Sequence, residues 1–182
     1  MVVMTCINGS PRSMSRTGVL LDSIAHAIMA RMPMERHDVA LASAGTHLLS
    51  GLTRRSQTRE GEAICRVVEE SDLLLVASPV YRGSYSGLLK HLFDLVDRDA
   101  LNGKIGLLAA TGGSAMHGLV LEHQFRPLMG FFGVQTVATG IYGLEHEVEI
   151  DGRIDQGLLD RVKRAAEQAV KLLRGSCALQ AC

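Results

Sequence analysis

The chain has 182 residues, with Lys plus Arg equal to Asp plus Glu at 19 each, and it contains no tryptophan. This length can bury a full core in one compact domain without disulfide or metal staples. The balanced charge and the small aromatic fraction argue against nucleic acid and anionic membranes as partners, so we expect small-molecule or protein partners.

The first part of the chain alternates apolar runs with segments of helical periodicity. The apolar run 2–7 predicts a strand that is covered on both faces, and 15–31 predicts a helix. A short strand is expected at 37–41. The stretch 42–58 has no clear period and predicts a long loop or a short irregular helix.

The rest of the chain continues the same alternation. The expected elements are a helix at 60–70, a strand at 72–80, a helix at 86–97, a strand at 105–110, a helix at 115–132, a strand at 134–142, a hairpin or turn at 147–154 and a helix at 155–173. Gly175 is expected just past the end of the last helix. We predict a single domain over 1–175 and a C-terminal tail over 176–182.

This order predicts an α/β fold with a five-stranded, doubly wound parallel sheet and helices on both faces. Ligands of such sheets bind outside the carboxyl ends of the strands, at the topological switch point. Three Gly- and Ser-rich loops follow the first, third and fourth predicted strands. We expect these loops to converge on one crevice.

The loop after the first strand has the features of an anion site. The start of the following helix presents free N–H groups and the positive end of its dipole, which favour a phosphate. Hydroxyl and guanidinium groups add further donors. The candidate phosphate ligands are Ser10, Arg12, Ser15, Arg16 and Thr17.

The other two loops suit a flat ring. Pro79 cannot continue a hydrogen-bonded ladder, so we expect free N–H groups from Val80 to Ser84 to meet the polar edge of a ring. Gly112 and Gly113 let the backbone approach that ring without a Cβ atom in the way. A phosphate at one end and a planar polar ring at the other describe FMN. The sequence has no G-x-G-x-x-G motif, which weighs against a Rossmann nicotinamide site.

Two alternative interpretations concern other phosphate chemistry. Cys6 and Arg12 have the C-x5-R spacing of low-molecular-weight tyrosine phosphatases, but Pro11 removes a loop N–H and no Asp-Pro pair follows to supply a general acid. The basic cluster Arg54, Arg55 and Arg59 could meet the 2′-phosphate of NADPH, although we expect a solvated charged loop there.

The cysteines and the apolar runs indicate in which cellular compartment the protein works. The four cysteines show no C-x-x-C pair and no His at zinc-ligand spacing, so we expect free thiols and no metal site. The start of the chain has no basic leader, and no apolar run is long enough to span a membrane. We therefore expect a cytoplasmic protein.

The three loops together resemble the NADPH-dependent FMN reductases. The matching stretches are 9–17, 78–87 and 110–114, within a resemblance that runs from Val3 to about Arg174. Within that family, the motifs are most similar to the reductase components of two-component alkanesulfonate and methanesulfonate monooxygenase systems. The resemblance implies a flavodoxin-like fold and a homo-oligomer, a dimer or more usually a tetramer.

The resemblance also implies roles for individual residues. It assigns the phosphate to the first-loop residues named above. The flavin ring would lie between two further groups, which are Pro79, Val80, Tyr81, Arg82, Gly83 and Ser84 on one side and Thr111, Gly112, Gly113, Ser114 and His117 on the other. In this family an inserted residue opens a π-type turn at the subunit interface. At the matching place stands His123, where a Tyr is typical of the alkanesulfonate branch.

The implied activity is transfer of hydride from NADPH or NADH to FMN, with reduced FMN passed to a separate sulfonate monooxygenase. The two cofactors supply this chemistry, so no catalytic side chain is predicted. The main alternative is a flavoprotein with tightly bound FMN that reduces quinones, azo compounds or metal oxyanions. A flavodoxin-like electron carrier is a weaker alternative because the chain has no net negative charge.

Overall fold

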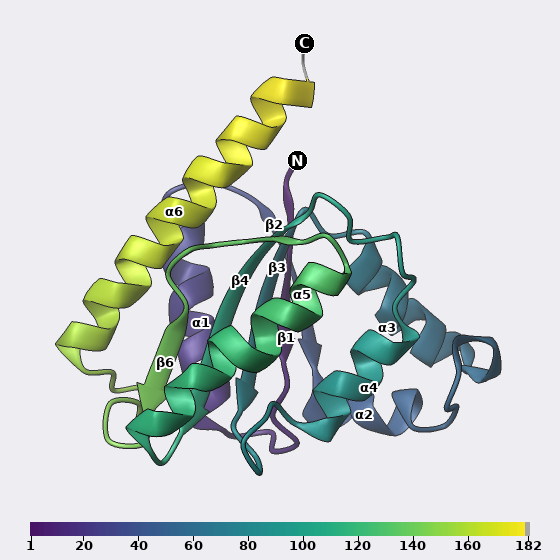
Figure 1. Cartoon of the computed structure of the whole chain (residues 1–182), viewed down its shortest axis with the longest axis horizontal. Helices are drawn as coiled ribbons and strands as arrows, with labels where there is room; N and C mark the ends of the chain where they lie inside the picture. The colour runs from purple at the N-terminus through teal and green to yellow at the C-terminus, as the bar shows by residue number, and fades with distance from the viewer. Residues whose placement is uncertain (181–182) are drawn as a thin grey trace.

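The computed structural model describes the backbone of residues 1–180 and the side chains of residues 1–176 (Figure 1). Most of the expected C-terminal tail therefore lies outside the described side chains, and the division of the chain at residue 175 stays a prediction. The strands are β1 (Val3–Asn8), β2 (Glu35–Ala40), β3 (Leu73–Pro79), β4 (Ile105–Gly112), β5 (Gln135–Thr136) and β6 (Ile141–Leu144). Neighbouring strands are parallel, in the order β2-β1-β3-β4-β5, and β6 also pairs with β4. This order is that of flavodoxin-like folds, which confirms the predicted sheet.

The two layers of helices follow from the two apolar faces of the sheet. On one face lie α1 (Arg16–Met29) and α6 (Gln156–Gln180), which pack on side chains such as Met4 and Leu75. On the other face lie α2 (Leu41–Leu48), α3 (Arg59–Glu69), α4 (Gly87–Leu95) and α5 (Arg126–Phe131). The side chains of β1, β3 and β4 are buried on both faces, which explains why these strands are continuous apolar runs rather than alternating ones.

The predicted fifth strand, 134–142, is broken into β5 and β6. Both pieces pair with β4, since Gln135 lies opposite Ile105 and Ile141 lies opposite Ala109. Between them, the N–H of Val137 still donates to the carbonyl of Gly106 at 2.8 Å, and side chains bond the other backbone groups of this stretch. Arg126 donates to the carbonyl oxygens of Val137 at 3.0 Å and Ala138 at 2.7 Å, and the N–H of Thr139 donates to Gln168 at 2.9 Å.

Two further expectations about helices need comment. Of the two alternatives for 42–58, the long loop is wrong and the short helix is right, because α2 occupies its start and a short 3-10 turn, η1, covers Arg54–Ser56. The buried positions Leu41, Gly45 and Leu48 give α2 a core-facing stripe that its Ser, Gly and Thr residues obscure. The last helix continues through Gly175 to Gln180 instead of ending at residue 173.

The expected helix at 115–132 is a succession of three kinds of helix. A 3-10 helix, η2, covers Ala115–Leu119, a π-helix, η3, covers Leu121–Phe125, and α5 follows. The N–H of Arg126 donates to the carbonyl of Leu121, five residues earlier. Pro127 has no N–H to restore the ordinary ladder after it. The π-type turn implied by the family resemblance is thus confirmed, and His123 lies within it.

Within residues 1–180, we find no helix that combines the length and the apolar character needed to cross a membrane.

Candidate functional site

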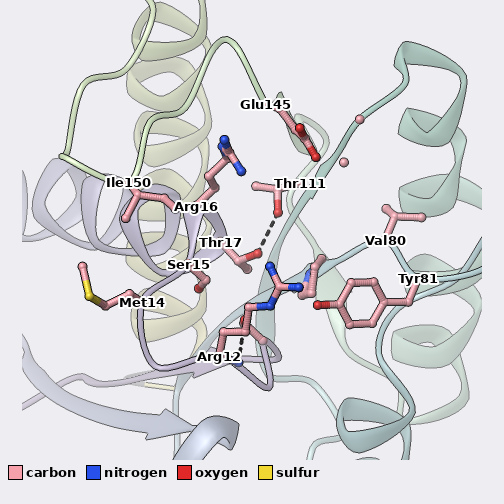
Figure 2. A pocket seen from close by; sticks show the side chains of 14 residues that line it. Arg12, Met14, Ser15, Arg16, Thr17, Val80, Tyr81, Thr111, Glu145 and Ile150 are labelled. Atoms are coloured by element: carbon pink, nitrogen blue, oxygen red, sulfur yellow. Dashed lines mark hydrogen bonds between the residues drawn. The ribbon is translucent and has the colours of Figure 1, made fainter.

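A pocket opens at the carboxyl ends of β1, β3 and β4 (Figure 2). The chain crosses from β1 to β2 on one side of this point and from β3 to β4 on the other, so the pocket lies at the switch point of the sheet. Most predicted site residues line it. They are Ser10, Arg12, Ser15, Arg16 and Thr17 from the first loop, Pro79, Val80 and Tyr81 from the second, and Thr111, Gly112 and Gly113 from the third.

Three lining residues, Met14, Glu145 and Ile150, are absent from the predicted set. Met14 belongs to the first loop but has neither a charge nor a hydroxyl group. Glu145 and Ile150 follow β6, at the carboxyl end of the broken edge strand. The rule that ligands bind at the carboxyl ends of parallel strands could have identified this fourth loop as well.

Five predicted residues do not line the pocket, namely Arg82, Gly83, Ser84, Ser114 and His117. His117 is exposed on η2. Arg82 and Gly83 form the tip of a tight turn, with φ of 53° and 80°. The N–H of Tyr81 donates to the carbonyl of Ser84 at 2.8 Å, and the N–H of Ser84 donates back at 3.1 Å. The tip of this closed turn therefore does not line the pocket.

The expected row of free N–H groups from Val80 to Ser84 is therefore wrong for three of its five residues. The N–H of Val80 donates to the carbonyl of Thr111 at 2.8 Å, and those of Tyr81 and Ser84 are used within the turn. Only the N–H groups of Arg82 and Gly83 in this segment are without a partner among the described residues. Tyr81, with 41% of its surface exposed, is the turn's contribution to the pocket.

The first loop is held in shape by its own polar groups. The hydroxyl of Ser10 accepts the N–H of Arg12 at 3.1 Å, and the N–H of Ser10 donates to Asn8 at 3.0 Å. Ser15 caps α1, since its hydroxyl accepts the N–H of Gly18 at 3.1 Å. Arg16 and Thr17 are the first two residues of α1, so their N–H groups have no acceptor within the helix. These groups lie at the end of α1 that borders the pocket.

Two arginines bring guanidinium donors to the pocket. The Nε atom of Arg16 is buried and has no hydrogen-bond partner among the described residues. The guanidinium of Arg12 and the ring of Tyr81 point toward each other across the pocket (Figure 2). A buried N–H without an acceptor costs about 1–3 kcal/mol, so a site of this kind gains from an anion that accepts these bonds. The residues present fit a phosphate group.

The third loop forms a wall in which the first glycine lies close to Tyr142. A Cβ atom on Gly112 would lie 2.5 Å from the Tyr142 hydroxyl, so a side chain there would displace the Tyr142 ring. That hydroxyl donates to the carbonyl of Ser114 at 2.7 Å and fixes the loop from behind. Burial raises the pKa of Tyr142, which keeps the hydroxyl protonated as a donor.

Buried hydroxyls also tie the first loop to the second. The Ser86 hydroxyl donates to the carbonyl of Gly9 at 2.6 Å, and the N–H of Ser86 donates to the hydroxyl of Ser78 at 2.9 Å. A Cβ atom on Gly9 would lie 2.9 Å from the carbonyl oxygen of Ala77, so the loops approach closely because position 9 is glycine. The pocket is thus preformed by contacts between segments that are far apart in the sequence.

The structure contradicts the phosphatase alternative. The Cys6 side chain is 1% exposed and packs in the core beneath α1 rather than lining the pocket. Burial raises its pKa to about 12. An attacking cysteine needs a lowered pKa, because the thiolate is the nucleophile. The C-x5-R spacing therefore has no catalytic meaning here. Cys6 and Cys65 are free thiols, and the side chains of Cys177 and Cys182 lie outside the described residues.

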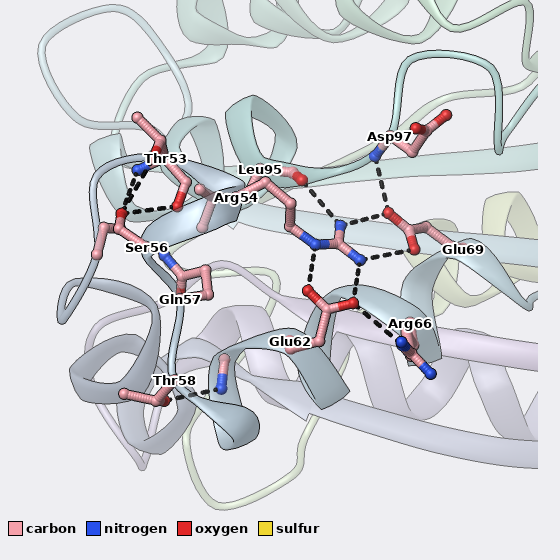
Figure 3. A network of polar contacts seen from close by, with 12 residues as sticks. Thr53, Arg54, Ser56, Gln57, Thr58, Glu62, Arg66, Glu69, Leu95 and Asp97 are labelled. Carbon is pink, nitrogen blue, oxygen red and sulfur yellow. Dashed lines mark hydrogen bonds and ion pairs between the residues drawn. The ribbon is translucent and has the colours of Figure 1, made fainter.

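The basic cluster after α2 is not uniformly solvated as expected. Arg54 donates to both oxygens of Glu62 at 2.5 and 2.9 Å and to both oxygens of Glu69 at 2.5 and 3.0 Å (Figure 3). It also donates to the carbonyl of Leu95 at 2.9 Å. Its side chain is 28% exposed. These contacts make Arg54 a structural link between η1, α3 and the end of α4, whereas Arg55 and Arg59 are exposed.

Comparisons with known proteins find similar flavin reductases and oxidoreductases. An NADH-dependent FMN reductase, SfnF, of Pseudomonas fluorescens is 42% identical over 93% of this chain and 90% of its own length. An FMN reductase (NADPH) of Pseudomonas aeruginosa is 41% identical over 94% of this chain and 92% of its own length. The solved structure of an oxidoreductase from Corynebacterium diphtheriae superposes with a TM-score of 0.84 at 31% identity, covering 96% of this chain and 98% of that one.

The sheet order and the pocket at its switch point define a flavodoxin-like fold. Residues 3–149 match the family described as NADPH-dependent FMN reductase. The chain belongs to this family. It is accordingly a flavin reductase that uses FMN and a reduced nicotinamide nucleotide.

Proposed function

We propose that the pocket at the ends of β1, β3 and β4 binds FMN with its phosphate on the first loop. The observation that supports this placement best is the buried, unpartnered Nε of Arg16 beside the free N–H groups at the start of α1. The Arg12 guanidinium faces the same space (Figure 2). An ionised phosphate accepts several such bonds at once, each stronger than a neutral one.

The flavin ring then lies between Tyr81 on the second loop and the Gly112–Gly113 wall on the third. When bound, FMN accepts a hydride from the nicotinamide, so the protein's task is to orient the two partners. The chain contributes the flat glycine surface, the Tyr142 hydroxyl that fixes it, and Pro79, which directs the second loop out of the sheet. We assign no catalytic side chain.

FMN is proposed to be a diffusible substrate rather than a permanent prosthetic group. Several lining residues are open to solvent, among them Tyr81 with 41% and Met14 with 73% of their surfaces exposed. Reduced FMN would leave for a separate flavin-dependent sulfonate monooxygenase, a role supported by the similarity of the motifs to reductase components of such systems. Because this reaction draws on NADPH or NADH, we place the protein in the cytoplasm.

We propose that the protein is a homo-oligomer, a dimer or tetramer, that covers the outer face of η2, η3 and α5. This face exposes the apolar side chains of Met116 (82%), Leu119 (59%) and Phe131 (67%). Burying such a patch against another subunit is favourable. His123, exposed on η3, would lie in the interface. Sedimentation of the wild type and of Leu119→Asp would test this. A wild-type monomer would contradict it.

Anaerobic mixing of the purified protein with FMN and either NADPH or NADH tests the proposed reaction. Bleaching of the visible flavin absorbance with one or both nucleotides is expected, and its absence would contradict the proposal. Dialysis before the assay separates the two modes of flavin use. A colourless protein that regains full activity with added FMN supports a substrate role, whereas a yellow protein indicates the tight-binding alternative.

A further inference from the structure

A pair of threonine hydroxyls connects the two ends of the pocket. Thr17, the second residue of α1, and Thr111, near the end of β4, have their Oγ1 atoms 2.6 Å apart. Both residues line the pocket, yet they are only 1% and 5% exposed. The hydrogen bond joins the helix start that faces the proposed phosphate to the strand that leads into the glycine wall (Figure 2).

Counting protons shows what this pair can do. Each threonine hydroxyl has one proton to donate and two lone pairs that accept. The mutual bond uses one of the two protons, and either residue can be its donor. One hydroxyl proton is therefore left over, either on Thr17 at the helix start or on Thr111 at the wall.

An anion at the start of α1 selects one of these two arrangements. The anion accepts a hydrogen bond from the Thr17 hydroxyl. The Thr17 oxygen must then accept the hydrogen bond that the Thr111 hydroxyl donates. A hydroxyl that accepts a hydrogen bond becomes a better donor, so the Thr111 hydroxyl strengthens the bond from Thr17 to the anion. The Thr111 oxygen keeps only lone pairs for the rest of the pocket.

We propose that Thr111 is a positioning residue that acts through Thr17 to favour flavins that have a 5′-phosphate. The hydroxyls form a relay in which Thr111 donates to Thr17 and Thr17 donates to the phosphate. This inference rests on the proposed function, because it requires the phosphate of FMN to lie at the start of α1. Thr111 then helps to select FMN over riboflavin without touching the phosphate, because it bonds only to the Thr17 hydroxyl.

The test is the ratio of the dissociation constants for riboflavin and FMN, measured by fluorescence titration of the full chain. Thr111→Val keeps the shape of the side chain and removes its hydroxyl. We expect the FMN preference to fall about three- to tenfold, through weaker FMN binding and unchanged riboflavin binding. Thr111→Ser restores the hydroxyl and should restore the preference. If Thr111→Val does not fold, Thr111→Ala removes the same hydroxyl and is measured instead.

A buried threonine elsewhere supplies a matched control. Thr5 is 0% exposed, and its hydroxyl donates to the carbonyl of Val67 at 3.0 Å in a part of β1 outside the pocket. Thr5→Val makes the same chemical change and should leave the FMN preference at its wild-type value. A similar fall in Thr5→Val would show that general destabilisation causes the effect and would overturn the relay.

The double variant Thr17→Val/Thr111→Val tests whether Thr111 acts through Thr17. We expect its FMN preference to equal that of Thr17→Val alone, since without Thr17 the Thr111 hydroxyl has nothing to direct. Independent, additive losses would overturn the relay, as would equal losses of FMN and riboflavin binding in Thr111→Val. A wild-type protein that binds the two flavins equally would instead contradict the phosphate placement in the proposed function.

Discussion

Two arginines, Arg16 and Arg54, show how the same side chain serves two purposes. Arg54 has every N–H of its guanidinium bonded to Glu62, Glu69 or the carbonyl of Leu95 (Figure 3). Arg16 has a buried Nε with no acceptor among the described residues. Both lie in stretches of the sequence that are rich in Arg and hydroxyl residues.

The difference teaches that the balance of donors and acceptors, not the density of basic residues, distinguishes a ligand site from a structural ion pair. The acidic partners of Arg54 lie 8 and 15 residues further along the chain, where α3 folds back on η1. The start of α1 has no acidic residue in its first turn to neutralise Arg16. An anion from solution can therefore bind at Arg16, whereas Arg54 has no free donor left for one.

The largest expected effect is on ligand binding. Arg16→Met keeps the aliphatic part of the side chain and removes the guanidinium. We expect FMN affinity to fall by about 1.5–3 kcal/mol, roughly tenfold or more, because a charge-assisted hydrogen bond is lost. The melting temperature of the ligand-free protein should stay the same or rise, since an unsatisfied buried donor is removed. Unchanged FMN titration would show that the phosphate is bound elsewhere.

Arg54→Met makes the matched change in the other region and should give the opposite result. It leaves Glu69, whose side chain is 14% exposed, without its cation. We expect the free energy of unfolding to fall by about 1–3 kcal/mol, less than for a fully buried pair because Arg54 is partly solvated. Denaturant unfolding measures this loss, and FMN affinity at low temperature should match the wild type. Weaker FMN binding in the folded variant would remove the distinction between the two arginines.

The pH dependence of stability sharpens the comparison further. Hydrogen bonds from Arg54 and then Arg66 lower the pKa of Glu62 to about 2. The unfolded chain protonates this group near pH 4.3. A lowered pKa stabilises the fold above the unfolded value, and this stabilisation is lost as the pH falls toward the folded value. The difference in melting temperature between wild type and Arg54→Met should therefore narrow below about pH 4.3. A constant difference would mean that Glu62 contributes little.

The smallest expected effect is at the other two arginines of the cluster. Arg55 and Arg59 are exposed and form no ion pair among the described residues. Arg55→Ala and Arg59→Ala should change stability by less than about 0.5 kcal/mol and leave the Michaelis constants for both nucleotides unchanged. A rise in the Michaelis constant for NADPH but not for NADH would revive the 2′-phosphate alternative.

The buried strands of the sheet, and the loops that meet at their carboxyl ends, could be predicted from the sequence alone. Buried strands are continuous apolar runs, and Gly, Pro and Ser punctuate them, so β1, β3 and β4 could be predicted from local pattern. The loop that holds Glu145 follows from the rule for the ends of parallel strands. That the Glu145 side chain itself lines the pocket does not, because it depends on where the chain passes after the break between β5 and β6. The role of Arg54 depends on which acidic side chains fold back onto it, which no local pattern shows.

The break in the edge strand has a consequence for solubility. An exposed edge of a parallel sheet presents unpaired backbone groups to which a strand from another chain can add. Here Arg126 occupies the carbonyls of Val137 and Ala138, and the two flanking strands span only 2 and 4 residues. On the opposite edge, β2 is rich in charged residues, with the sequence ERHDVA. Both edges of the sheet thus disfavour edge-to-edge pairing with a strand of another molecule.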